Sequence, residues 1–539
     1  MKLKENVEYI FYNGKIFTSN PDRPFSNTMT VVNGKITWIG DLEDQKELKG
    51  ELIDLQGKRV LPGFIDAHLH PLYLARTSKQ LSCTPPIIYS IEELIEKLHK
   101  QSKIQKTNDW IESWGYDEGK LTEGRSPTRW DLDKATTDTP IVVTRTCGHI
   151  VVANSKALEL AGINKDTPNP FGGEIDRDEN GEPTGILRET AKDIVKNVMP
   201  IPTMEENAEI LAELGQKLFE YGITAISELM ALSNPIDYLD MYNQACNKGL
   251  KQRSVLYYIY EDLKDQPILD KELTNRENNV HIGGVKLFAD GSVSGQTAWV
   301  NPPFLGGNEN YGIQTTSVEI LEAAAEIAKQ NRIQLVVHAM GEQAIDLIVN
   351  TFYESKGWLS DAPSIRIEHA AMPTKQALQR AAMAGIAFVT QPIFLYAEIE
   401  SYVRNLGSER TKQTYPIKSM LDAGISVAFS SDAPATAWAD PVNPFVGLKA
   451  AVTRIAYDGT DVGQDQKVDV STALTLYTKA AQEITRIPNV GQLKAGYHAD
   501  FIVLDRDILT IPKDEIDDVR VERTYMGGNL VYLREGTSK

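Results

Sequence analysis

Hydrophobic residues in the middle of the chain are grouped into short runs that predict eight buried strands. Helical stretches separate most of these runs; residues 318–330, for example, place Leu321, Ala325 and Ile327 on one helix face. Parallel strands require such crossover connections. The pattern therefore predicts an α/β fold in which residues 61–487 form a (β/α)8 TIM-type barrel. The strand candidates are residues 64–68, 223–227, 255–259, 285–288, 334–338, 365–369, 386–390 and 427–430.

Both ends of the chain have a different pattern, with short strand-like runs and turn residues. Asn13-Gly14 and Asn33-Gly34 are hairpin signals, and each precedes β-forming residues. Residues 500–505, 519–521 and 525–532 show the same texture near the C-terminus. Because chain termini often lie close together, we expect residues 1–60 and 488–539 to form one small β-sandwich. Two separate β units are the alternative.

A large insertion, residues 74–200, separates the first two strand candidates. It contains turn-rich segments such as residues 178–183. A connection that follows a barrel strand leaves from the face on which barrel enzymes carry their active sites. We therefore expect the insertion to act as a lid or as a wall that determines specificity.

The charge balance and the cysteines restrict the partners of the chain. Among 539 residues, 56 are basic and 74 acidic, and a net charge of −18 disfavours nucleic acid and anionic membranes. The sequence has no apolar stretch near the roughly 20 residues that span a bilayer. Its three cysteines form no CxxC pair, which is typical of a reducing cytosol. We expect a soluble cytoplasmic protein with a small-molecule substrate; a homodimer would suit a barrel of this size.

Two histidines lie at the end of the first strand candidate, in the segment Pro62-Gly63-Phe64-Ile65-Asp66-Ala67-His68-Leu69-His70. Residues two apart in a strand point to the same side, so both imidazoles can bind one metal ion. Taken alone, the pair could equally be two histidines that happen to lie near a strand end.

Further candidate ligands follow other predicted strands. His338 ends the fifth candidate, His369 the sixth, and Asp432 follows the eighth. Each has an ordinary structural explanation by itself; a Ser-Asp pair, for example, often caps a helix. The C-terminal ends of barrel strands meet on one face, however, so the full set predicts a metal site there.

Lys286 lies among apolar residues in the fourth strand candidate. Burying a lysine is costly unless the side chain is paired or deprotonated. A deprotonated lysine can react with carbon dioxide to give a carbamate, whose two oxygens can bridge two metal ions. The local sequence by itself favours another interpretation, in which Lys286 pairs with Asp290 or extends to solvent.

The order HxH, Lys, His, His, Asp on the first, fourth, fifth, sixth and eighth strands resembles the amidohydrolase superfamily. Other motifs resemble its third large family, in the branch of N-substituted formamide deformylase-like hydrolases, and the resemblance covers nearly the whole chain. Gly341-Glu342 departs from the Gly-Asp expected after His338. The motifs are Trp114-Gly115-Tyr116-Asp117, Pro127-Thr128-Arg129, Gly148-His149 with Asn154-Ser155, Gly172-Gly173, Asn180-Gly181-Glu182-Pro183-Thr184-Gly185, Gln391-Pro392 and residues 491–504.

The resemblance implies a site with two divalent metal ions, preferably Zn²⁺. Carboxylated Lys286 would bridge them; one metal would be held by His68, His70 and Asp432, and the other by His338 and His369. If Lys286 stays a free amine, a mononuclear site is the alternative.

The implied reaction is hydrolysis of an amide-type C–N bond in an N-acyl amine, an N-formyl amine or a cyclic amide. Metal-bound hydroxide would attack the carbonyl, and Asp432 would pass the proton to the leaving nitrogen. His149 is the candidate substrate-binding residue, with a structural role as its alternative. Ester hydrolysis or deamination at the same site, and a non-catalytic barrel regulator, are the competing functions.

Overall fold

The computed structural model describes residues 6–41, 49–104, 109–146, 148, 150–170, 173–200, 202–306 and 309–537. The chain divides into two compact units, which are described separately. The barrel unit consists of Met1–Pro71, Leu211–Asp432 and Val442–Lys539. The insertion unit consists of Leu72–Ile210 and Ala433–Pro441. None of the helices in the described ranges is both long and apolar enough to cross a membrane.

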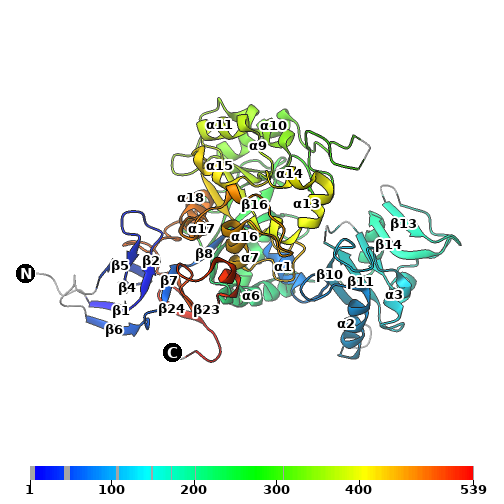
Figure 1. Ribbon diagram of the computed structural model, residues 1–539, viewed down its shortest axis with the longest axis horizontal. Helices are drawn as coiled ribbons and strands as arrows, with labels where there is room; N and C mark the ends of the chain where they lie inside the picture. Colours follow the sequence, from blue (N-terminus) through cyan, green and yellow to red (C-terminus); the bar gives the residue numbers. More distant parts are fainter. Residues whose placement is uncertain are drawn as a thin grey trace, which may run out of the picture. The chain divides into compact units, whose positions relative to one another are not determined.

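An eight-stranded sheet with parallel pairing forms the centre of the barrel unit, in the order β21-β20-β19-β18-β17-β16-β15-β8 (Figure 1). Every strand predicted from the hydrophobic pattern is present, so the prediction of an eight-stranded α/β barrel is confirmed. The strands are β8 (Phe64–Leu69), β15 (Ile223–Ala231), β16 (Arg253–Ile259), β17 (Val280–Phe288), β18 (Gln334–Ala339), β19 (Ile365–His369), β20 (Ala387–Thr390) and β21 (Val427–Phe429).

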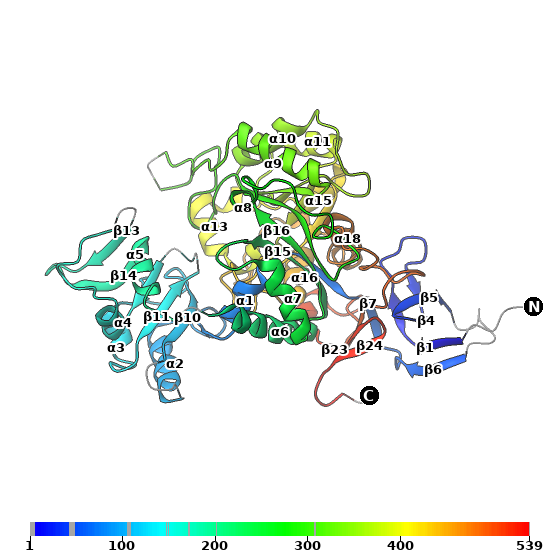
Figure 2. The same cartoon turned by 180° about the vertical axis from the view of Figure 1, so that it is seen from behind.

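Helices surround these strands, and several of them, such as α9 and α10, are amphipathic. The predicted helix at 318–330 is α9, which begins after Ser317, whose hydroxyl accepts a hydrogen bond from the Ile320 amide. Helices α9, α10 and α11 lie side by side outside the strands in both views (Figures 1 and 2). The helices are α6 (Met204–Glu220), α7 (Tyr238–Lys248), α8 (Tyr260–Leu263), α9 (Val318–Asn331), α10 (Glu342–Phe352), α11 (Lys375–Ala384), α12 (Pro392–Ala397), α13 (Ile399–Leu406), α14 (Ser408–Thr411), α15 (Ile417–Asp422), α16 (Pro444–Thr453), α17 (Val470–Leu476) and α18 (Lys479–Thr485), with the 3₁₀ helix η2 (Gln464–Gln466).

Strands β8 and β21 are the two edges of the sheet, and backbone and side-chain hydrogen bonds join the segments at these edges. The Asp432 amide donates to the His68 carbonyl at 2.8 Å. The buried Asp66 carboxylate accepts from the Ser431 hydroxyl at 2.6 Å, the Ser431 amide at 3.1 Å and the His68 amide at 3.3 Å. The Asp66 carboxylate and one backbone hydrogen bond therefore connect the two edges, where the other strands of the sheet are joined by regular backbone pairing.

The two ends of the chain form two further sheets, in the orders β5-β4-β1-β6 and β24-β23-β22-β7-β2-β3. The second sheet combines N-terminal and C-terminal strands, and Phe11 of the first packs in one core cluster with Phe501 and Tyr525 of the second. The strands are β1 (Asn6–Tyr12), β2 (Lys15–Phe17), β3 (Phe25–Ser26), β4 (Thr28–Val32), β5 (Lys35–Gly40), β6 (Lys49–Asp54), β7 (Arg59–Pro62), β22 (Phe501–Leu504), β23 (Val521–Met526) and β24 (Asn529–Leu533), with the 3₁₀ helix η3 (Lys513–Asp518).

One of the two predicted hairpins is present. Asn33-Gly34 joins the antiparallel strands β4 and β5, and both residues have the positive φ that a tight hairpin requires. The hairpin predicted at Asn13-Gly14 is wrong, because β1 and β2 belong to different sheets. There the chain passes between sheets, and Gly14 lies so close to Leu55 that a Cβ atom would approach its Cδ1 to 2.8 Å.

The insertion unit has a six-stranded sheet of its own, in the order β13-β14-β12-β11-β10-β9. The turn predicted at residues 178–183 joins β13 and β14. Two apolar clusters pack within this unit, so the insertion has its own core. The elements are α1 (Pro71–Thr77), β9 (Leu81–Ser82), α2 (Ile91–Ile104), β10 (Ile111–Tyr116), α3 (Arg129–Asp133), β11 (Ile141–Arg145), β12 (Ile150–Ala153), α4 (Ser155–Leu160), β13 (Gly173–Arg177), β14 (Pro183–Glu189) and α5 (Ala191–Lys196).

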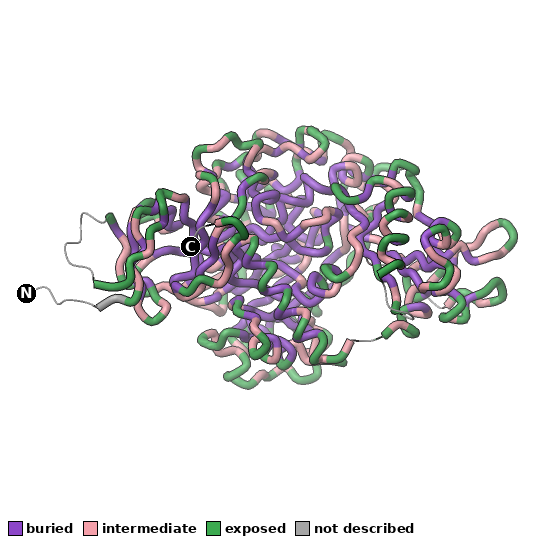
Figure 3. Tube along the Cα trace, turned by 90° about the horizontal axis from the view of Figure 1, so that it is seen from below, coloured by how far each residue is buried: buried purple, intermediate pink, exposed green. Residues whose placement is uncertain are grey.

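Burial follows this arrangement. In Figure 3 the buried residues concentrate in the interior of the barrel unit, whereas exposed residues follow its outer helices and loops. All residues of β19 and β20 are buried; β20 is a largely apolar run, whereas β19 buries three polar side chains, Arg366, Glu368 and His369.

We predict that Asp66→Ala destabilises the protein more than Ser431→Ala does. The first change leaves two backbone amides and a hydroxyl at the seam without their acceptor, at a cost of about 3 kcal/mol, against about 1 kcal/mol for the loss of one hydroxyl. Urea unfolding of the metal-free proteins measures the difference. Equal stability of the two variants would mean that Asp66 does not hold the seam.

Candidate metal centre

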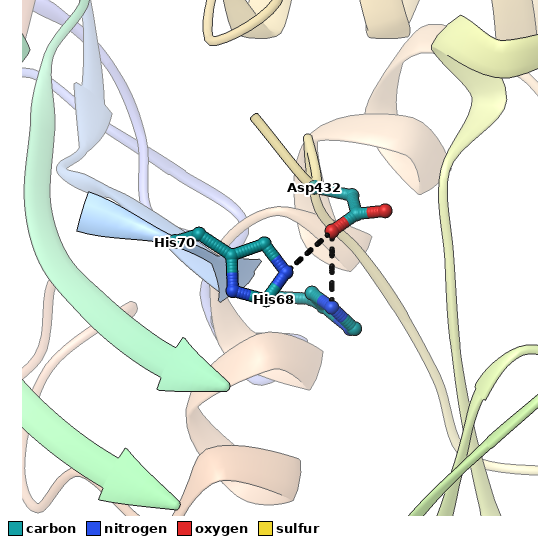
Figure 4. Close-up of side chains that lie close together, drawn as sticks. All are labelled: His68, His70 and Asp432. Carbon is teal, nitrogen blue, oxygen red and sulfur yellow. Dashed lines mark ion pairs between the residues drawn. The ribbon is translucent and has the colours of Figure 1, made fainter. Parts of the chain in front are cut away.

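Three of the predicted ligands converge at the seam of the barrel. His68 lies on β8, His70 directly follows this strand, and Asp432 follows β21. The Asp432 Oδ1 atom lies 3.1 Å from His68 Nε2 and 3.0 Å from His70 Nε2 (Figure 4). One ligand atom from each residue lies within 4.8 Å of the others. Two imidazoles and a carboxylate at this spacing can bind a divalent metal ion.

His338 and His369 bring two more imidazoles to the same place. Their ring centroids are 4.4 Å apart, and the rings of His68 and His369 are 4.9 Å apart. His369 Nδ1 lies 4.0 Å from Asp432 Oδ2. His68 and His70 are neighbours in the sequence, whereas His338, His369 and Asp432 come from distant segments that the strand ends of the barrel bring to them.

Lys286 on β17 also belongs to this group. Its side chain is 1% exposed, and its Nζ atom, 5.0 Å from the centre of the Phe288 ring, has no hydrogen-bond partner among the described residues. Burial lowers the pKa of Lys286 to about 8, although the charges of Glu368 and Asp432 act in the opposite direction.

The interpretation favoured by the local sequence, in which Lys286 pairs with Asp290 or reaches solvent, is wrong. The Asp290 carboxylate is buried and is occupied by backbone amides, those of Trp299, Met340 and Gly341. The buried Lys286 amine therefore does not pair with Asp290 and is available to another group.

Each of the four candidate metal-binding histidines has a hydrogen-bond acceptor or a carboxylate behind its ring. Such a group fixes the tautomer and turns the other nitrogen toward a metal. No role behind a histidine was predicted for Glu368, Glu228 or Gln391, although Gln391 belongs to a motif noted in the sequence and a glutamate within a buried strand is itself a signal for Glu368. The contacts are His68 Nδ1 with Glu368 Oε2 at 2.6 Å, His369 Nδ1 with Gln391 Oε1 at 2.8 Å, His338 Nε2 with the Gly291 carbonyl at 2.9 Å, and His70 Nδ1 with Glu228 Oε1 at 3.5 Å.

The electrostatics of the site suit a bound cation. Burial lowers the pKa of His338 to about 4, so this ring is neutral at neutral pH, which is the form that binds metals. Burial also acts to lower the pKa of His70, but Asp432 and Glu228 raise it to about 9. The same two carboxylates would favour a metal ion beside His70.

The backbone at the site has an uncommon conformation. His369, Ala370 and Asp432 have φ values of 69°, 46° and 54°, in the left-handed region that residues other than glycine seldom occupy. In a regular strand Glu368 and His369 would point to opposite sides. The left-handed conformation of His369 ends this alternation, so the side chains of Glu368 and His369 both approach His68. Such strain is concentrated at functional sites.

The remaining candidate, His149, lies outside the described residues. The Gly148 backbone beside it is described and has a φ of 75°. A substrate-binding role for His149 stays a prediction.

Comparison with known proteins agrees with this geometry. The sequence model of the amidohydrolase family matches residues 51–532, and the chain belongs to this family. It is 28% identical to the Bacillus subtilis amidohydrolase-type protein YtcJ, over 98% of this chain and 99% of that protein. It is also 28% identical to N-substituted formamide deformylase of Arthrobacter pascens, over 98% and 99% of the two chains.

A solved structure supports the same class. The crystal structure of an uncharacterised metal-dependent hydrolase from Pyrococcus horikoshii superposes with a TM-score of 0.76 and 28% sequence identity. The match covers 94% of this chain and 99% of that one. Together with the His68, His70 and Asp432 cluster, it identifies the chain as a hydrolase with a divalent-metal site.

We predict that zinc stabilises the protein through these histidines. Free Zn²⁺ at about 100 times its dissociation constant should add about 2.7 kcal/mol to the free energy of unfolding, because it binds only the folded state. Thermal unfolding with and without Zn²⁺ measures this effect. The double variant H68A/H70A is the control. An equal rise of its unfolding temperature with Zn²⁺ would mean that zinc binds at another site.

Proposed function

We propose that the protein hydrolyses an amide-type C–N bond in a small molecule: an N-acyl amine, an N-formyl amine or a cyclic amide. The observation that carries this proposal is the convergence of His68, His70, His338, His369 and Asp432 at the strand ends of the barrel. The similarity to N-substituted formamide deformylase over nearly the whole of both chains favours the C–N bond over an ester.

The proposal includes two zinc ions bridged by carboxylated Lys286. Nitrogen and carboxylate donors suit zinc. The neutral Lys286 amine would attack carbon dioxide, forming an N–C bond and releasing one proton to solvent, and the product is a carbamate anion. Burial and a pKa of about 8 support this step, because they increase the neutral fraction of the amine. His68, His70 and Asp432 would hold one metal, and His338 and His369 the other.

A divalent metal supplies Lewis acidity that polarises a carbonyl and lowers the pKa of water. The chain itself supplies the proton transfer. Asp432 would accept the proton of the attacking water on its carboxylate and return it to the leaving nitrogen. Its position after β21, with the amide tied to the His68 carbonyl, keeps this carboxylate beside the histidines throughout.

The proposal extends to the terminal sheets, which we infer form one β-sandwich. The cluster that includes Phe11, Phe501 and Tyr525 supports this inference, because it draws residues from both sheets and from both ends of the chain.

Asp432→Asn should lower kcat for N-formyl and N-acyl amines by a factor of about 10² to 10⁴, because an amide cannot accept the proton. Part of the zinc should remain bound through the histidines. Steady-state hydrolysis and metal content measure the two effects. Asp517→Asn, which removes a carboxylate paired with Lys449 away from the site, is the control. Undiminished turnover in Asp432→Asn would exclude this proton transfer.

Lys286→Ala should lower the zinc content from about two ions per chain to about one, because the bridging ligand is lost. In the parent protein, bicarbonate should promote zinc uptake more at pH of about 9 than at about 7, since the amine is neutral above a pKa of about 8. Elemental analysis measures both. Lys449→Ala is the control, and zinc content unaffected by Lys286→Ala would contradict the bridge.

A further inference from the structure

A completely buried ion pair lies in the interior of the barrel. Arg366 and Glu368, both on β19, are 0% exposed. The Arg366 Nε and NH2 groups donate to the two Glu368 oxygens at 2.6 and 3.0 Å. A buried ion pair is often no more stabilising than well-packed apolar residues of similar volume, because both charges lose their hydration. Its presence at this position therefore points to a role other than stability.

The carboxylate of the pair also contacts a candidate metal ligand. Glu368 Oε2 lies 2.6 Å from His68 Nδ1, which makes this the shortest of the contacts behind the four histidine rings. The contact crosses the barrel, from β19 to β8. A carboxylate in this position accepts a hydrogen bond from the Nδ1–H group of His68. The proton then stays on Nδ1, and the lone pair of Nε2 is directed toward Asp432.

The Arg366 guanidinium also has hydrogen-bond partners other than Glu368. Its NH2 group donates to the Ala67 carbonyl at 2.6 Å, one residue before His68. Its NH1 group donates to the Tyr257 hydroxyl at 3.1 Å, and the guanidinium lies 4.9 Å from the centre of that ring. Arg366 therefore links the backbone and the side-chain partner of His68. It also cancels the charge of Glu368, so the pair orients His68 without adding net negative charge to the site.

We propose that Arg366 and Glu368 form a positioning unit that holds His68 in the one tautomer and ring orientation in which Nε2 can bind metal. The inference rests on the metal site of the proposed function. Neither residue acts on substrate; both act through His68. The unit determines how tightly the metal is bound.

The experiment compares zinc affinity with folding in the full-length chain. Glu368→Gln keeps the size of the side chain, but its amide can donate to Nδ1 and so select the wrong tautomer. The double variant R366M/E368L removes both charges together, so that neither is left unpaired. Asp500→Asn is the matched control, because it takes a buried carboxylate away from another arginine, Arg253, on β16.

Zinc dissociation constants are measured by competition with a chromophoric chelator, and the folding of the metal-free proteins by thermal unfolding. We expect both Glu368 variants to bind zinc about 10 to 100 times more weakly than the parent. The double variant should unfold within a few degrees of the parent, because an apolar pair can replace the buried charges. Asp500→Asn should keep the parent's zinc affinity even where it lowers the unfolding temperature.

Parent-like zinc affinity in a folded R366M/E368L variant would overturn the inference while leaving the proposed function intact. An equal loss of affinity in Asp500→Asn would also overturn it, because the effect would then be general destabilisation. If the double variant does not fold, Glu368→Gln decides by the same comparison. A parent chain that binds no zinc would overturn both the inference and the proposed function.

Discussion

The seam between β8 and β21 joins the two edges of the barrel sheet, and the metal centre depends on it. His68 and His70 lie on one side of the seam and Asp432 on the other, so the distance between the edges sets the distances of about 3 Å among their ligand atoms. The seam is held by Asp66 and by the bond from the Asp432 amide to the His68 carbonyl. These contacts use the same short segments that carry the ligands. Closure of the barrel and assembly of the site are therefore one structural event.

The site concentrates features that are unfavourable elsewhere in a protein. Three such features lie within a few residues of the strand ends: a lysine that has no hydrogen-bond partner in the described part of the chain, a fully buried ion pair and residues with left-handed backbone. Each costs free energy when considered alone. Hydrogen bonds from the surrounding strands fix the ion pair in one position, whereas the Lys286 amine receives no such bond among the described residues. A divalent cation among these carboxylates and neutral imidazoles would add an attraction that the apolar barrel interior cannot supply.

The histidines differ in how firmly they are held. The contact of His68 with Glu368 is 2.6 Å, whereas the distance from His70 to Glu228 is 3.5 Å, and Glu228 in turn accepts a hydrogen bond from the Tyr242 hydroxyl at 3.1 Å. His369 is held by Gln391. The amide nitrogen of Gln391 donates to the hydroxyl of Ser430, which directly follows β21. The groups behind the rings thus connect β8, β15, β19 and β21. This network explains how side chains from separate strands keep one common geometry.

The strand positions and the candidate ligand residues could be predicted from the sequence alone, because both are local properties. An apolar run bounded by turns identifies a strand, and a histidine at its end is visible without any partner. The partners could not be predicted in the same way: His68 and Glu368 are 300 residues apart, and only the closed barrel places them in contact. The surroundings of Lys286 could not be predicted either, because its local sequence favoured pairing with Asp290. At Asn13-Gly14 the hairpin signal was misleading, because the strands on either side of it pair in two different sheets. The sequence by itself determined the elements and the kinds of ligand. Tertiary structure decided which groups surround each ligand, because hydrogen bonding and burial depend on distances in space and not on spacing along the chain.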